Sequence, residues 1–171
     1  MFRLVKIEEL DLVWQIIMDA KKFIASYNSP QWQGNYPTKE VLIKDINTSS
    51  MHAYVDEGII KGIIVLKKEF TKNYVNIDGC WEYPVSDDDL VIHRIAVKEE
   101  YRGLGLGVKL LEYAIEYARD NNLTHIKTDT HPLNIPMQKS CERVGFKRVG
   151  IVYSMLEQLD KTRYAYELIL R

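Results

Sequence analysis

The spacing of apolar residues predicts an alternation of strands and helices along the chain. Residues 2–7 alternate in polarity like a strand, and apolar residues recur every three or four positions over 8–27, as in an amphipathic helix. A polar loop then leads to a helix at 39–48, for which Thr38 is a suitable N-terminal cap. Residues 51–69 form two apolar runs around an Asp-Glu-Gly turn, which predicts a β-hairpin.

The second half of the chain continues the alternation of strand and helix patterns. Residues 90–97 (LVIHRIAV) are a short, strongly apolar run, which is typical of a central strand, whereas 70–89 shows no clear period. The other expected elements are a helix at 107–122, a strand at 125–130, a short helix at 133–146 that ends near Gly145, and closing strands at 146–154 and 163–170. The pattern predicts one domain of the α/β class over residues 1–171.

The composition is that of a soluble globular domain, with 46% hydrophobic and 27% charged residues. Lys and Arg number 23 against 24 Asp and Glu, and the net charge of -1 argues against a nucleic-acid or membrane partner. The N-terminal segment is charged where a signal peptide is apolar, and no run reaches about 18 apolar residues. The two cysteines, Cys80 and Cys141, lack CxxC spacing, which fits a reducing compartment. A cytoplasmic protein is expected.

Three glycines at alternate positions, Gly103, Gly105 and Gly107, separate the central strand from the next helix. Such a turn presents free backbone N–H groups and the positive end of the helix dipole to one small volume. That volume suits a phosphate or pyrophosphate, and Arg102 can add a fixed positive group. The alternative is a turn in which the glycines only let the strand and the helix pack closely.

Two nucleotide-binding patterns fit this spacing poorly. A Walker loop needs Ser or Thr after its Gly-Lys pair, whereas Lys109 follows Val108 and precedes Leu110. The dinucleotide fingerprint needs its third glycine at position 108, although Asp129 imitates the ribose-binding acid of that motif. The Walker class is therefore excluded, and a nucleotide-dependent oxidoreductase stays open as an alternative.

The run Arg102-Gly103-Leu104-Gly105-Leu106-Gly107, preceded by IHRIAV, resembles motif A of the GNAT N-acetyltransferase superfamily, Arg/Gln-x-x-Gly-x-Gly/Ala. Asn134 and CERVGF (141–146) are similar to motif B of that superfamily, and both motifs stand in the expected order. The resemblance covers essentially all 171 residues. It implies an acyl-CoA N-acyltransferase fold, in which a mixed central sheet has helices on both faces. The sheet would be splayed at the cofactor strand by a bulge near residues 93–95.

The resemblance also implies a cosubstrate and the residues that bind it. Acetyl-CoA would be bound and no metal would be needed. Its pyrophosphate would lie on the backbone of residues 102–108, that is, Arg102, Gly103, Leu104, Gly105, Leu106, Gly107 and Val108. Its pantetheine arm would pair with backbone groups of Ile95, Ala96 and Val97, and Asn134 would bond the arm from the neighbouring strand end.

The chain departs from motif B at Cys141, where many members of the superfamily carry a tyrosine that is assigned as the acid for the leaving thiolate. A thiol could donate a proton to a thiolate of similar basicity. The alternative is a small buried residue that only packs.

Acetyl transfer to an amine also needs a group that removes a proton from the nitrogen. His93 is the first candidate, because imidazoles titrate near neutrality and because arylalkylamine N-acetyltransferases carry a catalytic histidine at this position of the cofactor strand. A structural histidine in the sheet is the alternative. Glu82 and Asp78, in the irregular segment before that strand, are further candidates.

The acceptor site is expected between the first loop and the strands opposite the cofactor. Tyr27, Trp32 and Tyr36 are candidates for its wall, because aromatic faces can receive an amine. The stretch QWQGNYP is similar to loops of bacterial small-molecule acetyltransferases, which favours a small amine over a histone tail; a peptide N-terminus stays possible.

The sequence thus predicts an enzyme that transfers an acetyl group from acetyl-CoA to a primary amine in a ternary complex. A coenzyme A-binding module with little catalysis is an alternative, because Cys141 replaces the usual tyrosine. A homodimer is possible, as in many similar enzymes.

Overall fold

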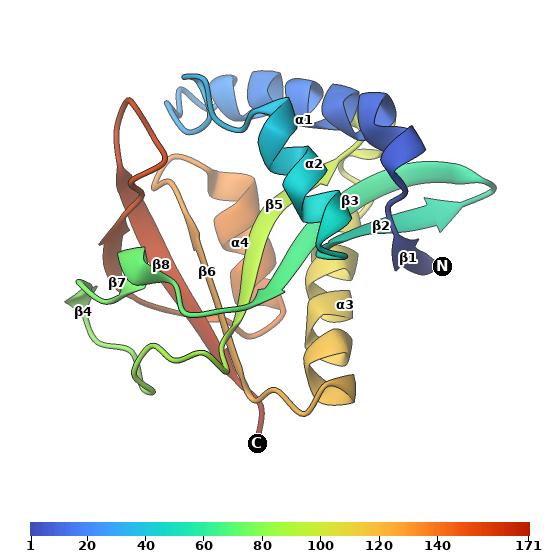
Figure 1. Ribbon diagram of the computed structural model, residues 1–171. Coiled ribbons are helices and arrows are strands. Elements are labelled where there is room, and N and C mark those ends of the chain that lie inside the picture. The colour runs from blue at the N-terminus through green and yellow to red at the C-terminus, as the bar shows by residue number, and fades with distance from the viewer.

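One eight-stranded sheet runs through the computed structural model, which describes all 171 residues (Figure 1). The strand order is β1-β2-β3-β5-β6-β8-β7-β4, and β5 and β6 are the one parallel pair. The strands are β1 (Phe2–Leu4), β2 (Met51–Asp56), β3 (Ile59–Lys68), β4 (Asp78–Gly79), β5 (Leu90–Val97), β6 (His125–Thr130), β7 (Lys147–Tyr153) and β8 (Thr162–Ile169). The expected mixed sheet is confirmed.

Helices cover both faces of this sheet, as expected. They are α1 (Leu10–Ala25), α2 (Lys39–Asn47), α3 (Leu106–Asp120) and α4 (Ile135–Arg143), with 3-10 turns at Ile7–Glu9, Lys72–Tyr74 and Glu99–Tyr101. The Thr38 side chain accepts the Val41 N–H at 3.3 Å, so the predicted cap of α2 is confirmed. No helix is both long enough and apolar enough to cross a membrane.

The alternation of side chains in β3 explains the two layers. Ile63 and Val65 point into a core formed with α1 and α2, while Ile64 and Leu66 point into a second core formed with α3 and α4. All four side chains are almost fully buried, which explains why residues 63–66 are apolar without a break instead of alternating between apolar and polar.

The sheet opens between its two parallel strands. β5 and β6 pair through only two residue pairs, the second of which joins Val91 to Lys127. On the other side of β5, Arg94 and Ile95 both lie opposite Ile64 of β3, which is the β-bulge expected near residues 93–95. The Arg94 backbone has φ +39°, a left-handed conformation that is rare for a side chain of this size. Beyond Val91 the two strands therefore diverge and leave a gap.

Several element bounds differ from the sequence prediction. The first strand ends at Leu4 and the first helix begins at Leu10, because a 3-10 turn occupies residues 7–9. The irregular segment 70–89 includes the two-residue strand β4, which pairs with β7 at the edge of the sheet. The helix predicted over 133–146 is α4, which begins after the cap residue Asn134 and ends before Gly145, whose φ is +99°.

Candidate active site

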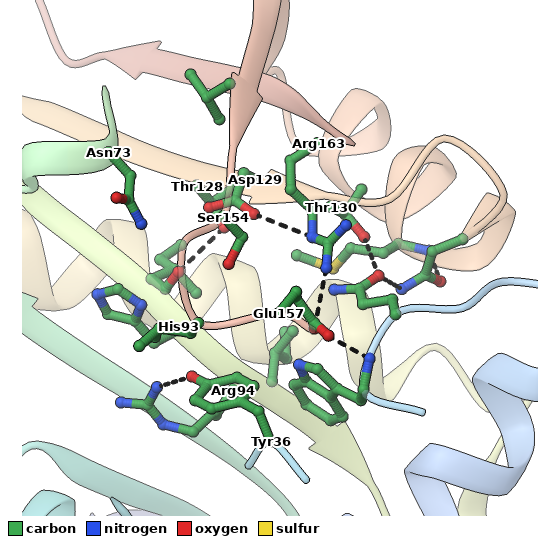
Figure 2. A pocket seen from close by; sticks show the side chains of 18 of the residues that line it. Tyr36, Asn73, His93, Arg94, Thr128, Asp129, Thr130, Ser154, Glu157 and Arg163 are labelled. Atoms are coloured by element: carbon green, nitrogen blue, oxygen red, sulfur yellow. Dashed lines mark hydrogen bonds and ion pairs between the residues drawn. The ribbon is translucent and has the colours of Figure 1, made fainter. Parts of the chain in front are cut away.

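Two adjoining cavities open where β5 and β6 diverge. The first, called here the glycine-loop cleft, is lined by residues 95–97 of β5, by the glycine loop (residues 102–108) and by one side of α4. The second, called here the inner pocket, is lined by residues 92–95 of β5, 128–130 of β6 and the turn between β7 and β8 (Figure 2). Both cavities are lined by Ile24, Ile95, Asn134 and Met137. They therefore meet beside the bulge.

The backbone of the glycine loop is arranged for an anion. Gly103 and Gly105 have φ values of +75° and +77°, and a Cβ built at either one would meet no atom within 4 Å. The first hydrogen bond of α3 runs from the Lys109 N–H to the Gly105 carbonyl at 3.1 Å. The amides of residues 106–108 thus precede the helical ladder and have no partner within it. Together they form the positive end of a helix of 15 residues.

Arg102 adds an unpaired donor to the same cleft. Its guanidinium carbon lies 4.6 Å from the centre of the Phe23 ring, and its Nη2 is buried without a hydrogen-bond partner. A buried guanidinium nitrogen without an acceptor is costly unless an anion supplies one. The cleft therefore fits a phosphate-bearing ligand on evidence that is independent of the glycines.

The open edge of β5 forms the opposite wall of the cleft. Ile95, Ala96 and Val97 lie beyond the last pair with β6, so backbone groups on that side have no strand partner. Asn134 stands across the gap, where its Oδ1 accepts the Met137 N–H at 3.4 Å and caps α4. Its Nδ2 donates to Gln31 Oε1 at 3.3 Å.

His93 faces the inner pocket from β5 and is paired with a carboxylate. Its Nε2 lies 2.7 Å from Glu69 Oε1, at the end of the neighbouring strand β3. The hydrogen bond from His93 lowers the pKa of Glu69, so this carboxylate is ionised and accepts. The proton of a neutral imidazole is then on Nε2, and Nδ1 keeps a free lone pair.

Beneath the pocket, Arg94 forms a buried ionic network. Its Nε and Nη2 bind Asp45 at 2.6 and 2.9 Å, and its Nη1 donates to the Tyr36 hydroxyl. Lys67 also lies 2.8 Å from Asp45. Burial raises the pKa of Tyr36, so its phenol stays protonated. The network fixes the bulge and places Tyr36, from the first loop, against the pocket.

A second network lines the far side of the pocket (Figure 2). Arg163 of β8 forms two ion pairs: its Nη2 lies 2.9 Å from Glu157 Oε1, and its Nε lies 3.8 Å from Oδ1 of Asp129 in β6. The Tyr74 hydroxyl donates to Asp129 Oδ2 at 2.6 Å. Burial is the main cause that holds the pKa of Tyr74 well above its ordinary value, and the negative charge of Asp129 is the second. The backbone N–H of Trp32 donates to Glu157 at 3.0 Å, which joins the first loop to the turn between β7 and β8.

Residues 21–146 match the family model described as the acetyltransferase (GNAT) family. This chain belongs to the GNAT acetyltransferase family. The expected family and fold are therefore confirmed, and the enzyme class is that of acetyl-CoA-dependent N-acetyltransferases. The interpretation as a dinucleotide-dependent oxidoreductase is left without support.

Three proteins serve as examples of those similar to this GNAT protein. A GNAT-family acetyltransferase from Streptococcus agalactiae, known as a crystal structure, is 28% identical with a TM-score of 0.88 and covers 100% of this chain and 95% of its own. The aminoglycoside N(6')-acetyltransferase type 1 of Klebsiella pneumoniae is 26% identical over 80% of this chain and 73% of its own. The probable N-acetyltransferase camello of Xenopus tropicalis is 35% identical over 47% of this chain, which spans only 38% of that relative.

Most residues predicted to bind the cosubstrate do line the glycine-loop cleft of this GNAT protein. They are Ile95, Ala96, Val97, Arg102, Gly103, Gly105, Leu106, Gly107, Val108 and Asn134. Leu104 does not line it, because its side chain is 69% exposed at the tip of the loop. Trp32 and Tyr36 line the inner pocket. Tyr27 lines neither cavity, because its ring packs against Phe23 at the end of α1.

Two further candidates lie away from both cavities. Glu82 follows β4 at the sheet edge, where its N–H donates to Glu167 at 2.9 Å and its carboxylate accepts from Arg171 at 2.7 Å. Asp78 is exposed in β4, opposite Ile151. The acidic residues that the inner pocket does contain, Asp129 and Glu157, were not predicted as part of the acceptor site.

Cys141 points into the core beneath α4 and lines neither cavity. It is fully buried, and burial raises the pKa of its thiol to about 12.

Because the thiolate is the reactive form, iodoacetamide at mildly alkaline pH is expected to modify the exposed Cys80 and to spare Cys141 until the protein unfolds. Mass spectrometry of the folded wild type and of Cys80→Ser measures this. Modification of folded Cys80→Ser would contradict the placement of Cys141.

Proposed function

We propose that this GNAT protein transfers the acetyl group of acetyl-CoA directly to a primary amine of a small molecule. The observation that carries the proposal is that the glycine-loop cleft and the inner pocket meet at Ile95 and Asn134. A thioester in the first cavity and an amine in the second would thus be held against each other. Such positioning supplies much of the rate of a reaction between two bound substrates.

Residues of the cleft divide the binding of acetyl-CoA between them. The free amides of residues 106–108 and the unpaired Nη2 of Arg102 would hold the pyrophosphate. The open edge of β5 at Ile95 and Val97 would pair with the amide groups of the pantetheine arm. When bound, acetyl-CoA supplies an acetyl group that is already activated as a thioester.

His93 is the proposed general base. The ammonium form of the acceptor must lose one proton before its nitrogen can attack, and the nitrogen loses a second when its bond to the acetyl carbon replaces the bond from that carbon to sulfur. Nδ1 of His93 is the free acceptor on this side of the pocket, directly or through a water molecule, and the departing thiolate of coenzyme A takes up a proton from the imidazolium or from solvent. Glu69 fixes the imidazole by accepting from Nε2, and it stabilises the positive charge that proton uptake creates. Glu69 is thus a positioning residue, and Cys141 has no part in this scheme.

The closure of the inner pocket favours a small acceptor. The first loop and the turn between β7 and β8 bond to each other through Trp32 with Glu157, at 3.0 Å, and through the Asn35 N–H with Gln158, at 3.4 Å. These contacts bridge the pocket where a long peptide would otherwise pass. The similarity to an aminoglycoside acetyltransferase also supports a small amine.

Thermal stabilisation followed by a thiol-release screen tests this proposal. Acetyl-CoA and coenzyme A are expected to raise the melting temperature, whereas NAD and ATP are not. Thiol release from acetyl-CoA should then depend on an added primary amine. Stabilisation without release for any amine would instead favour a coenzyme A-binding module.

A further inference from the structure

The inner pocket contains a buried carboxylate oxygen without a partner. Glu157 is 3% exposed, and its Oε1 already accepts from the Trp32 N–H and lies 2.9 Å from Arg163. Its Oε2 has no hydrogen-bond partner. Figure 2 shows the Glu157 carboxylate in the pocket, beside Arg163. A buried anionic oxygen without a hydrogen-bond partner lowers the stability of the fold, and a donor group on a bound ligand would remove this cost.

The positive charges nearby do not satisfy this oxygen. Arg163 donates through Nη1 to two backbone carbonyls, at 3.0 and 2.7 Å. Its Nη2 lies 2.9 Å from Glu157 Oε1 but makes no hydrogen bond, and the one charge of Arg163 faces the carboxylates of both Glu157 and Asp129. Arg94 is committed to Asp45 and Tyr36. The wall formed by Arg163, Glu157 and Asp129 thus has one negative charge in excess.

Asp129 offers a second acceptor on the same wall. Its Oδ2 accepts from Tyr74, while its Oδ1 has only Arg163, at 3.8 Å, which is too far for a hydrogen bond. The two carboxylates come from different elements, β6 and the turn between β7 and β8, and both line the pocket that His93 faces. They present spare acceptors with net negative charge, which is the environment that an ammonium group requires.

We propose that Glu157 and Asp129 form a subsite for a second, cationic group of the acceptor, so that the preferred substrates are diamines or polyamines. This inference rests on the proposed function, because it concerns the pocket assigned to the acceptor. The reacting nitrogen loses its proton at His93, while the other nitrogen stays an ammonium and donates to Glu157 Oε2. The two ends of a diamine are thereby treated differently by one pocket.

Equilibrium binding tests the subsite without relying on turnover. Calorimetry with the enzyme saturated by coenzyme A compares α,ω-diamines with n-alkylamines and ω-amino alcohols of the same chain length. The best diamine is expected to bind about 10-fold more tightly than its monoamine, which corresponds to about 1.4 kcal/mol. Glu157→Gln keeps an acceptor for the Trp32 N–H and removes the charge, so it should abolish this preference.

The controls separate the subsite from folding and from the proposed function. Glu142→Gln removes an exposed carboxylate of α4 and should keep the full diamine preference, while Asp129→Asn should weaken it. Equal binding of diamine and monoamine by the wild type, equal binding of the amino alcohol and diamine, or an unchanged preference in a folded Glu157→Gln would each overturn the subsite. Diamine-selective binding without acetyl transfer to any amine would instead overturn the proposed function and support the subsite.

Discussion

Replacing Gly105 with glutamate is expected to abolish the binding of acetyl-CoA. Gly105 precedes α3 with φ +77°, and the space that a Cβ would enter is open. A glutamate there would place a carboxylate beside the amides of residues 106–108 and beside Arg102, where it would occupy the anion site and repel the pyrophosphate. The dissociation constant of coenzyme A is expected to rise by at least about 100-fold, or about 2.7 kcal/mol.

Gly58→Glu is the matched control for this substitution. Gly58 has φ +76°, and a Cβ there would also meet no atom within 4 Å, but it lies in the turn between β2 and β3. Both variants place the same charged residue in the same left-handed conformation, which costs each about 1 kcal/mol of stability. Calorimetry should therefore find coenzyme A affinity lost in one variant and retained in the other. Equal affinity in both would show that the glycine loop does not bind the cosubstrate.

Replacing His93 with glutamine is expected to lower kcat by about 100-fold, which is at the low end of the contribution that a general base usually makes. Glutamine keeps a donor for Glu69 but cannot take up a proton at neutral pH. The affinity for coenzyme A should not change, because His93 does not line the glycine-loop cleft. Initial rates of thiol release, with acetyl-CoA and the amine both saturating, measure kcat for the wild type and the variant.

Two further variants define the role of His93 more closely. Glu69→Gln keeps the side-chain shape and removes the charge that stabilises the imidazolium, so kcat should fall by about 10-fold. His125→Gln changes a histidine that stacks on Tyr83 away from both cavities, and it should leave kcat unchanged. A folded His93→Gln enzyme with normal kcat would remove His93 from catalysis.

The parts of the site that are local in sequence could be predicted before the structure was known. The strand at 90–97 is apolar except for His93 and Arg94 because it is buried on both faces, and the glycine loop follows it after one short turn. The position of the glycine loop before α3 and the bulge in β5 both agree with the prediction. These features depend on backbone chemistry within one strand-turn-helix unit, and such units have a recognisable spacing.

The acceptor side could not be predicted in the same way, because it depends on contacts between distant segments. Glu157 lies in a connection without periodicity, and only its bonds to Trp32 and Arg163 bring it into the pocket. Glu82 was expected nearby, but a two-residue strand draws its segment to the sheet edge. Arg163 does carry a sequence signal, since an arginine within a largely buried closing strand requires a buried acidic partner.

The most direct test of the central claim measures initial rates of thiol release while acetyl-CoA and a reactive primary amine are both varied. Direct transfer between adjoining cavities predicts double-reciprocal lines that intersect, an acetylated amine as product, and no acetylated form of the protein by mass spectrometry after incubation with acetyl-CoA alone. Parallel lines together with an acetylated protein would contradict the account, because the acetyl group would then pass through a side chain of the enzyme before it reached the amine.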